Sequence, residues 1–176
     1  KTLLKNFSTK VFFLDRDGVI NHDAGYVYKK SEFKFLNGVL KGLKILSKNK
    51  FLIIIITNQS GIGRGFFKLS DFNKITEHMK KIVSKNGSNV DDIYFCPHHP
   101  KYGIGKYKKK CNCRKPKAGL LQSAISNWSV NINKSFMIGD KVIDRKASEK
   151  FKIKFFYKKN QPFDYQIKKI LNLGLG

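Results

Sequence analysis

The chain has 176 residues, and its 36 Lys and Arg against 12 Asp and Glu give a formal net charge of +24. This balance excludes an acidic disordered tail or an acidic Ca²⁺ buffer, and 41% apolar residues over this length predict one domain, residues 1–176, with a sizeable core. A strongly basic chain is typical of nucleic-acid or membrane ligands, but only four of the cations are Arg. Because nucleic-acid readers rely on the planar Arg fork, we interpret the charge as a solvated lysine surface.

The cysteines and the apolar runs indicate the cellular compartment of the chain. Three cysteines leave an odd thiol, so a reducing compartment or a metal is favoured over a disulfide framework. The longest apolar run, 51–56, is too short to cross a bilayer, and residues 1–10 lack the apolar region of a secretory signal. We therefore expect a cytoplasmic monomer with no membrane partner.

Short apolar runs alternate along the chain with longer helical patterns. This alternation predicts an α/β fold: a three-layer, Rossmann-like parallel sheet with helices on both faces, small loop insertions and no large cap. In such a sheet the site lies at the carboxyl ends of the strands. In chain order, the sequence predicts a strand at 11–14, a helix at 39–47, a strand at 51–56, a helix at 70–83 that Ser70 caps, a strand at 93–95, a helix at 118–128, strands at 136–138 and 153–157, and a last helix at 162–171.

Two carboxylates follow the first predicted strand. Asp15 and Asp17 are separated by one residue, and Gly18 allows a tight turn that gives them different roles. Close carboxylates repel each other and need a cation or a shared proton, and Mg²⁺ is a hard ion that prefers oxygen ligands. One Asp could then attack phosphorus while the other moves the proton. The alternative is an ordinary Asp-Gly turn with solvated side chains.

Polar residues also follow two other predicted strands. The segment 57–61, Thr-Asn-Gln-Ser-Gly, is a suitable anion cradle or else an ordinary polar turn. Gly139, Asp140 and Lys141 end the strand at 136–138, where the alternative is a helix cap with a solvated lysine. Because these strand ends should meet at one edge of a parallel sheet, their convergence favours a functional site over three unrelated turns.

The cysteines cluster around one loop, residues 96–113. Their spacing with one histidine, Cys-x-His-x₁₂-Cys-x-Cys, suits a tetrahedral Cys₃His site for Zn²⁺ that is closed and therefore structural. The choice of His98 over His99 follows this pattern, and His99 is left beside the metal or in solvent. Such a loop would aim Arg114 and Lys115 at the phosphate site. The predicted zinc ligands are Cys96, His98, Cys111 and Cys113.

These residues resemble the motifs of the haloacid dehalogenase superfamily of phosphohydrolases. Asp15-x-Asp17-Gly18 is similar to its first motif, Thr57 to its second, Lys115 to its third and Gly139-Asp140 to its fourth. The resemblance implies that Asp15 is the nucleophile, Asp17 the general acid/base, and Thr57 and Lys115 the groups that hold the phosphoryl oxygens. It also implies a Mg²⁺ site made by Asp15, the backbone carbonyl of Asp17, and Asp140.

The zinc loop narrows the resemblance to the D-glycero-D-manno-heptose-1,7-bisphosphate 7-phosphatases and the related histidinol-phosphate phosphatases. The gap of twelve residues between His98 and Cys111 is similar to that of the heptose enzymes. This implies a small-molecule sugar bisphosphate as substrate and a place in nucleotide-activated heptose and lipopolysaccharide synthesis. The substrate contacts implied by the resemblance are Asp23, Ala24, Gly25, Tyr26, Thr57, Asn58, Gln59, Ser60, Arg114, Lys115 and Lys141.

Two alternatives remain beside this reading. Histidinol-phosphate phosphatase is disfavoured by the length of the loop. A nucleic-acid-binding protein or nucleic-acid end phosphatase is suggested by the net charge, by the lysines at 106–110, and by the aromatic residues within 150–159. For the second segment we favour a buried strand flanked by surface lysines. The roles of Lys117, Asp144 and residues 151–176 stay open.

Overall fold

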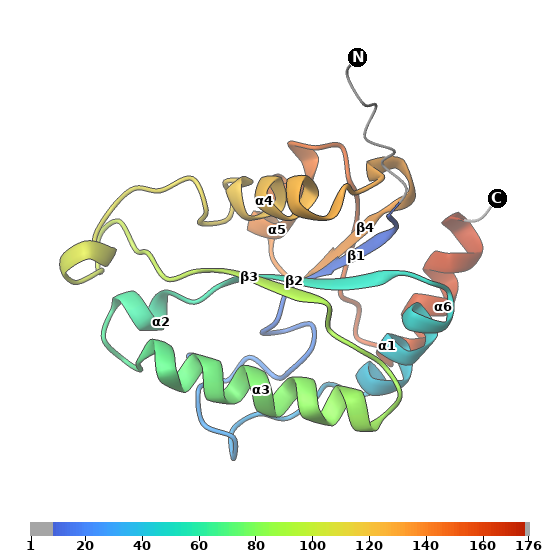
Figure 1. Ribbon diagram of the computed structural model, residues 1–176, viewed down its shortest axis with the longest axis horizontal. Helices are drawn as coiled ribbons and strands as arrows, with labels where there is room; N and C mark the ends of the chain where they lie inside the picture. Colours follow the sequence, from blue (N-terminus) through green and yellow to red (C-terminus); the bar gives the residue numbers. More distant parts are fainter. Residues whose placement is uncertain (1–8, 175–176) are drawn as a thin grey trace.

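A computed structural model describes residues 9–174, so the expectation made for residues 1–10 lies almost wholly outside the described part (Figure 1). The chain forms a five-stranded sheet with the order β3-β2-β1-β4-β5, and all of its strand pairs are parallel. The strands are β1 Val11–Leu14, β2 Leu52–Asn58, β3 Asp92–Cys96, β4 Phe136–Gly139 and β5 Lys154–Tyr157.

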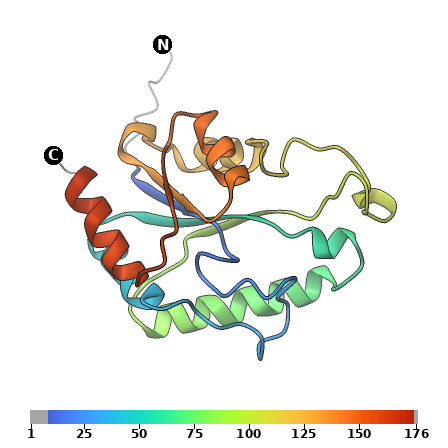
Figure 2. The same ribbon diagram turned by 180° about the vertical axis from the view of Figure 1, so that it is seen from behind.

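Helices cover both faces of this sheet, which confirms the predicted three-layer α/β fold. Helices α1, α3 and α6 lie on one face, and α4 and α5 lie on the other (Figures 1 and 2). The helices are α1 Val39–Lys48, α2 Ser60–Gly63, α3 Leu69–Lys85, α4 Gly119–Trp128, α5 Val142–Glu149 and α6 Phe163–Gly174, with 3₁₀ turns η1 Gly105–Tyr107 and η2 Ile132–Lys134. None of the helices within residues 9–174 combines the length and the apolar character that crossing a bilayer requires.

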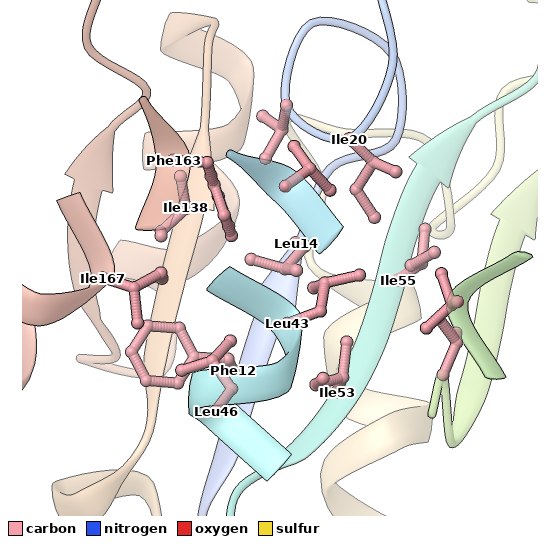
Figure 3. Packing of buried hydrophobic residues seen from close by; sticks show 14 of the residues in the cluster. Phe12, Leu14, Ile20, Leu43, Leu46, Ile53, Ile55, Ile138, Phe163 and Ile167 are labelled. Atoms are coloured by element: carbon pink, nitrogen blue, oxygen red, sulfur yellow. The ribbon is translucent and has the colours of Figure 1, made fainter. Parts of the chain in front are cut away.

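The central strands divide their side chains between two cores. Phe12 and Leu14 of β1 and Ile53 and Ile55 of β2 face α1 and α6, as Figure 3 shows. Their immediate neighbours along the chain point to the opposite face and pack against α4 and α5. This alternation explains why the apolar run of β2 is continuous: both faces of the strand are buried. The second core contains Val11, Phe13, Ile54, Ile56, Leu121, Ala124 and Ala147.

Two predicted helix features need correction. Ser70 does not cap the second long helix, because α3 already begins at Leu69 after Lys68, whose backbone N–H donates to Asp71 Oδ2 at 2.9 Å. Helix α5 was expected only as an alternative, through the possible helix cap at 139–141, and the structure shows that helix, with Lys141 at its N-cap. Its buried residues are Asp144, Ala147 and Ser148, so it lacks the apolar stripe that normally reveals a helix.

The predicted burial of the last strand is also only partly correct. In β5 the side chains of Lys154 and Tyr157 are exposed, and those of Phe155 and Phe156 are half-buried. Phe155 and Phe156 nevertheless pack against the cores on opposite faces of the sheet. β5 is less buried than β1 because it lies at the edge of the sheet.

The loops that follow the strands gather at the carboxyl edge. The loop carrying η1 and the short helix α2 lie at the same end of the molecule (Figures 1 and 2). They are joined by a hydrogen bond from the backbone N–H of Ile104 to the carbonyl of Gly63, at 2.8 Å. Helix α2 is a turn of helix within the predicted anion cradle, and its residues Ser60–Gly63 are buried.

Candidate active site

The carboxyl ends of β1 and β2 meet the loops of residues 15–38 and 97–118 around a cavity of about 310 Å³. Most of the residues predicted to be catalytic or to bind substrate are among those that line it. Thr57, the last residue but one of β2, is buried with 1% of its surface exposed and is not among the lining residues. The lining residues are Asp15, Asp17, Asp23, Gly25, Tyr26, Asn58, Gln59, Ser60, Lys115, Lys141 and Ile143.

Lys115 forms the buried floor of this cavity. Its Nζ lies 3.0 Å from Asp15 Oδ1 and 2.6 Å from Asp144 Oδ1, and it donates to the carbonyl of Ile56 at 2.8 Å. Burial lowers the pKa of Lys115, but the two carboxylates together raise it above its ordinary value. The side chain of Asn58 binds the backbone of Lys115 twice: its Oδ1 accepts from the Lys115 N–H at 3.0 Å, and its Nδ2 donates to the Lys115 carbonyl at 3.1 Å. Lys115 is therefore a fixed cation beside Asp15.

Asp15 carries the most perturbed carboxyl group of the cavity. Burial raises its pKa to about 6, the charge of Lys115 opposes that shift, and the charge of Asp144 adds to it. The backbone N–H of Arg16 donates to Asp15 Oδ1 at 2.8 Å, which orients the carboxylate. A buried carboxylate held in this way at the end of a strand is suited to act as a nucleophile.

Three carboxylates are close enough to share a cation. Oxygens of Asp15, Asp140 and Asp144 all lie within 4.8 Å of one another. Oδ1 of Asp140 is buried and has no hydrogen-bond partner within residues 9–174, and burial raises the pKa of this group. A set of hard, under-satisfied oxygens fits Mg²⁺. Asp144 is a member of this cluster that the motif analysis left open, and the contribution of the Asp17 carbonyl stays a prediction.

Gly18 permits the close approach of the first and fourth motifs. Its φ is +83°, and a Cβ at this position would lie 2.3 Å from Asp140 Oδ2. A larger residue would push Asp140 away from Asp15, so the glycine of the first motif has a steric role as well as a conformational one.

The carboxylate of Asp17 is held by a different set of groups. Arg16 donates to it from Nε and Nη2, Asn21 Nδ2 donates to Oδ1 at 2.9 Å, and Gln59 Nε2 donates to Oδ2 at 2.9 Å. Gln59 also donates to Thr57 Oγ1 at 2.9 Å. This network connects the predicted acid/base to the predicted phosphate site. Sequence reasoning missed Arg16 and Asn21, although a cation between two aspartates was a visible signal.

The rim of the cavity is made by charged groups from distant loops. Lys141 Nζ lies 2.8 Å from Asp23 Oδ2 and 3.8 Å from Asp140 Oδ2. The hydrogen bond from Lys141 keeps the pKa of Asp23 below its ordinary value even though partial burial opposes it. Arg114 is outside the residues that line the cavity, and its Nη1 donates to the carbonyl of His98 at 3.3 Å, so its contact with substrate stays a prediction.

The predicted zinc ligands form a compact cluster beside this site. Ligand atoms of Cys96, His98, Cys111 and Cys113 lie within 4.8 Å of one another, and His98 Nδ1 is 3.2 Å from Cys113 Sγ. Burial and the neighbouring thiols raise the pKa of Cys96. Three soft sulfur donors and an imidazole fit Zn²⁺ well. His99 is outside this group, because its Nδ1 accepts from the backbone N–H groups of residues 101 and 102.

The sheet is parallel, a turn with two aspartates follows its first strand, and a buried lysine contacts the first of those aspartates. Together these features define a phosphatase of the haloacid-dehalogenase-like class. The sequence model of the polynucleotide kinase 3 phosphatase family matches residues 10–168. The D-glycero-beta-D-manno-heptose-1,7-bisphosphate 7-phosphatase of Haemophilus influenzae is 45% identical over 145 residues, covering 82% of this chain and 78% of the relative. The enzyme of the same name from Escherichia coli is 40% identical over 141 residues, covering 80% of this chain and 74% of the relative.

A solved structure agrees with these relatives. The D,D-heptose 1,7-bisphosphate phosphatase from B. bronchiseptica, complexed with magnesium and phosphate, matches with a TM-score of 0.78 and 25% identity, over 94% of this chain and 99% of that one. The chain belongs to the D-glycero-β-D-manno-heptose-1,7-bisphosphate 7-phosphatase family, and it is a phosphoric monoester hydrolase.

Proposed function

We propose that this chain is a Mg²⁺-dependent phosphatase that removes the 7-phosphate of D-glycero-D-manno-heptose 1,7-bisphosphate, in nucleotide-activated heptose synthesis. The observation that carries the reaction is the 3.0 Å contact between the buried groups Asp15 and Lys115 at the floor of the cavity. The sugar is supported by relatives that are 40–46% identical and carry that activity in their names. We also propose that residues 1–176 act as one domain, monomeric and cytoplasmic.

Asp15 and Asp17 divide the chemistry between them. A carboxylate oxygen of Asp15 attacks phosphorus, the bond from phosphorus to the sugar oxygen breaks, and Asp17, which is protonated at the start of this step, donates its proton to that oxygen and becomes a carboxylate. Asp17 then takes a proton from water, which attacks the aspartyl-phosphate and releases phosphate and the free Asp15 carboxylate. Lys115 and Thr57 hold the phosphoryl oxygens during both steps.

Asp15, Asp140 and the backbone carbonyl of Asp17 would hold Mg²⁺, with Asp144 close to the same position. When bound there, the ion would neutralise charge on the phosphoryl group and on the surrounding carboxylates. Asp144 holds Lys115 at 2.6 Å and so keeps the lysine in line with Asp15.

The rim of the cavity suits a second phosphate on the substrate. A sugar bisphosphate carries about four negative charges near neutral pH. Lys141 lies at the mouth of the cavity, paired with Asp23, and can exchange that partner for a substrate phosphate. Arg114 would reach the substrate by leaving the carbonyl of His98. Zn²⁺ held by the cysteine loop would be structural, because its four protein ligands leave no open position. The remaining proposed contacts are Asp23, Ala24, Gly25, Tyr26, Asn58, Gln59 and Ser60.

A phosphate-release panel tests this proposal. The substrates are both anomers of heptose 1,7-bisphosphate, fructose 1,6-bisphosphate, histidinol phosphate and a DNA oligonucleotide with a terminal 3′-phosphate, all with Mg²⁺. We expect one heptose anomer to exceed the other substrates in kcat/KM by at least about tenfold. A preference for histidinol phosphate or for the oligonucleotide would overturn the assignment of the sugar.

A further inference from the structure

Arg16 is the largest fully buried side chain of the described residues, although it carries a charge. Its Nε and Nη2 donate to Asp17 Oδ1 at 3.2 and 2.9 Å, and Nη2 also donates to Oδ2 at 3.0 Å. A further hydrogen bond runs from Nη2 to the carbonyl of Val27 at 2.9 Å. The ring of Phe72 lies with its centroid 5.8 Å from Cζ. A guanidinium so enclosed has little freedom to move.

The charges of the cavity fall into separate groups. Lys115 pairs with Asp15 and Asp144, and Lys141 pairs with Asp23 and Asp140. Within residues 9–174, the carboxylate paired with Arg16 is that of Asp17. Because burying a charge without a counter-ion is costly, the guanidinium and the Asp17 carboxylate stabilise each other in place.

The pairing also determines where the Asp17 carboxylate points. The planar fork of Arg16 contacts both oxygens from one side, which a lysine ammonium cannot reproduce. Asn21 Nδ2 and Gln59 Nε2 donate to the same carboxylate, each at 2.9 Å. Since Gln59 also donates to Thr57 Oγ1, the carboxylate is held at a defined distance from the phosphate site.

We propose that Arg16 is a positioning residue for proton transfer: it clamps Asp17 at the cavity wall so that one carboxylate serves both half-reactions. This inference rests on the proposed function, which assigns proton transfer to Asp17. Both steps require the carboxyl group of Asp17 in one place, first as the acid beside the departing sugar oxygen and then as the base beside the attacking water. Displacement of a reacting group by about 1 Å costs on the order of 100-fold in rate.

The test separates the two half-reactions with p-nitrophenyl phosphate, because p-nitrophenolate departs without receiving a proton. In Arg16→Lys, Mg²⁺-loaded enzyme mixed rapidly with this substrate should release one p-nitrophenolate per active site in a burst and then turn over slowly. With heptose 1,7-bisphosphate the same variant should lose about 100-fold in kcat, with KM little changed. Arg16→Gln, which keeps a single donor but no charge, serves in the same way should Arg16→Lys fail to fold.

Asp17→Asn distinguishes failure of this inference from failure of the proposed function. If Asp17 moves the proton, Asp17→Asn shows the same burst and slow turnover; if Asp17→Asn keeps normal turnover, the proposed mechanism fails and the inference fails with it. When Asp17→Asn behaves as expected, unchanged kcat in folded Arg16→Lys overturns the inference alone. If Arg16→Lys shows neither the burst nor steady turnover, the inference is overturned as well. Arg16 would then act on phosphorylation of Asp15 or on the fold.

Discussion

Lys115 joins two carboxylates that come from different parts of the chain, Asp15 after β1 and Asp144 in α5, at 3.0 and 2.6 Å. All three groups are buried, and burial raises the pKa of Asp15 to about 6 in spite of the lysine. A buried group whose pKa is raised becomes ionised more readily when a cation joins it. The charge of the proposed nucleophile therefore depends on what is bound at the end of β1.

Replacing Asp15 by Asn tests the nucleophile directly. The amide keeps the shape of the side chain but does not form the acyl phosphate, so we expect kcat to fall by on the order of 10³-fold or more. The fold should survive, because Lys115 keeps its contact with Asp144. Phosphate release and thermal unfolding measure the two effects. Appreciable residual phosphatase activity would contradict the assignment of Asp15.

Mg²⁺ binding should weaken as the pH falls through about 6, because protons then compete for Asp15, whose pKa is raised to about 6 by burial. Asp140 shifts in the same direction. In metal-free protein, the folded state binds a proton at Asp15 more readily than the unfolded state does. The free energy of unfolding should therefore increase as the pH falls from about 6 toward 3.8.

The rise in melting temperature on adding Mg²⁺ to EDTA-treated protein should therefore be larger at pH about 7.5 than at pH about 5.5. A Mg²⁺ effect that does not change between these pH values would show that Asp15 is not a ligand.

The loop between β3 and α4 connects the cluster of three cysteines and His98 to Lys115. It begins at Cys96, the last residue of β3, and it contains Cys113 directly before Arg114 and Lys115, with Cys111 two residues before Cys113. Asn58 at the end of β2 anchors the backbone of Lys115. The position of Lys115 thus depends on two elements, the loop and the neighbouring strand.

Two adjacent histidines provide a matched comparison for this loop. We expect elemental analysis of the wild-type protein to give one zinc atom per chain, and His98→Gln to lose it. The variant should also have a lower kcat/KM, because Arg114 and Lys115 would be displaced. His99→Gln should keep the zinc, because His99 Nδ1 accepts from backbone N–H groups rather than facing the thiols. Metal-free wild-type protein with full activity would refute the structural role of zinc.

Across the whole molecule, the charge of +24 is far larger than the site requires. The proposed reaction uses a few cations, among them Lys115 and Lys141 in the cavity. In β5, Phe155 and Phe156 are half-buried against the cores and are poorly placed to stack on bases. The remaining lysines raise the solubility of the chain and its non-specific attraction for anions.

Binding to single-stranded DNA should therefore be weak and purely electrostatic. We expect no change in the fluorescence anisotropy of a labelled oligonucleotide at about 150 mM salt, and at lower salt only binding that falls steeply with ionic strength. Tyr157→Ala should not alter such binding, although Tyr157 is the exposed aromatic residue of β5. Tight binding at the higher salt that Tyr157→Ala abolishes would support the nucleic-acid alternative instead.

Local patterns in the sequence were enough to predict the strands, the parallel sheet, the aspartates of the first motif and the Cys₃His set, because each rests on short spacings or on apolar periodicity. The same patterns indicated α5, which has few apolar residues, only as an alternative, and they did not reveal the start of α3. Only the tertiary structure joined Asp144 to Lys115 and Arg16 to Asp17 with Asn21 and Gln59. These contacts depend on strand register and loop paths, which place residues from separate segments together.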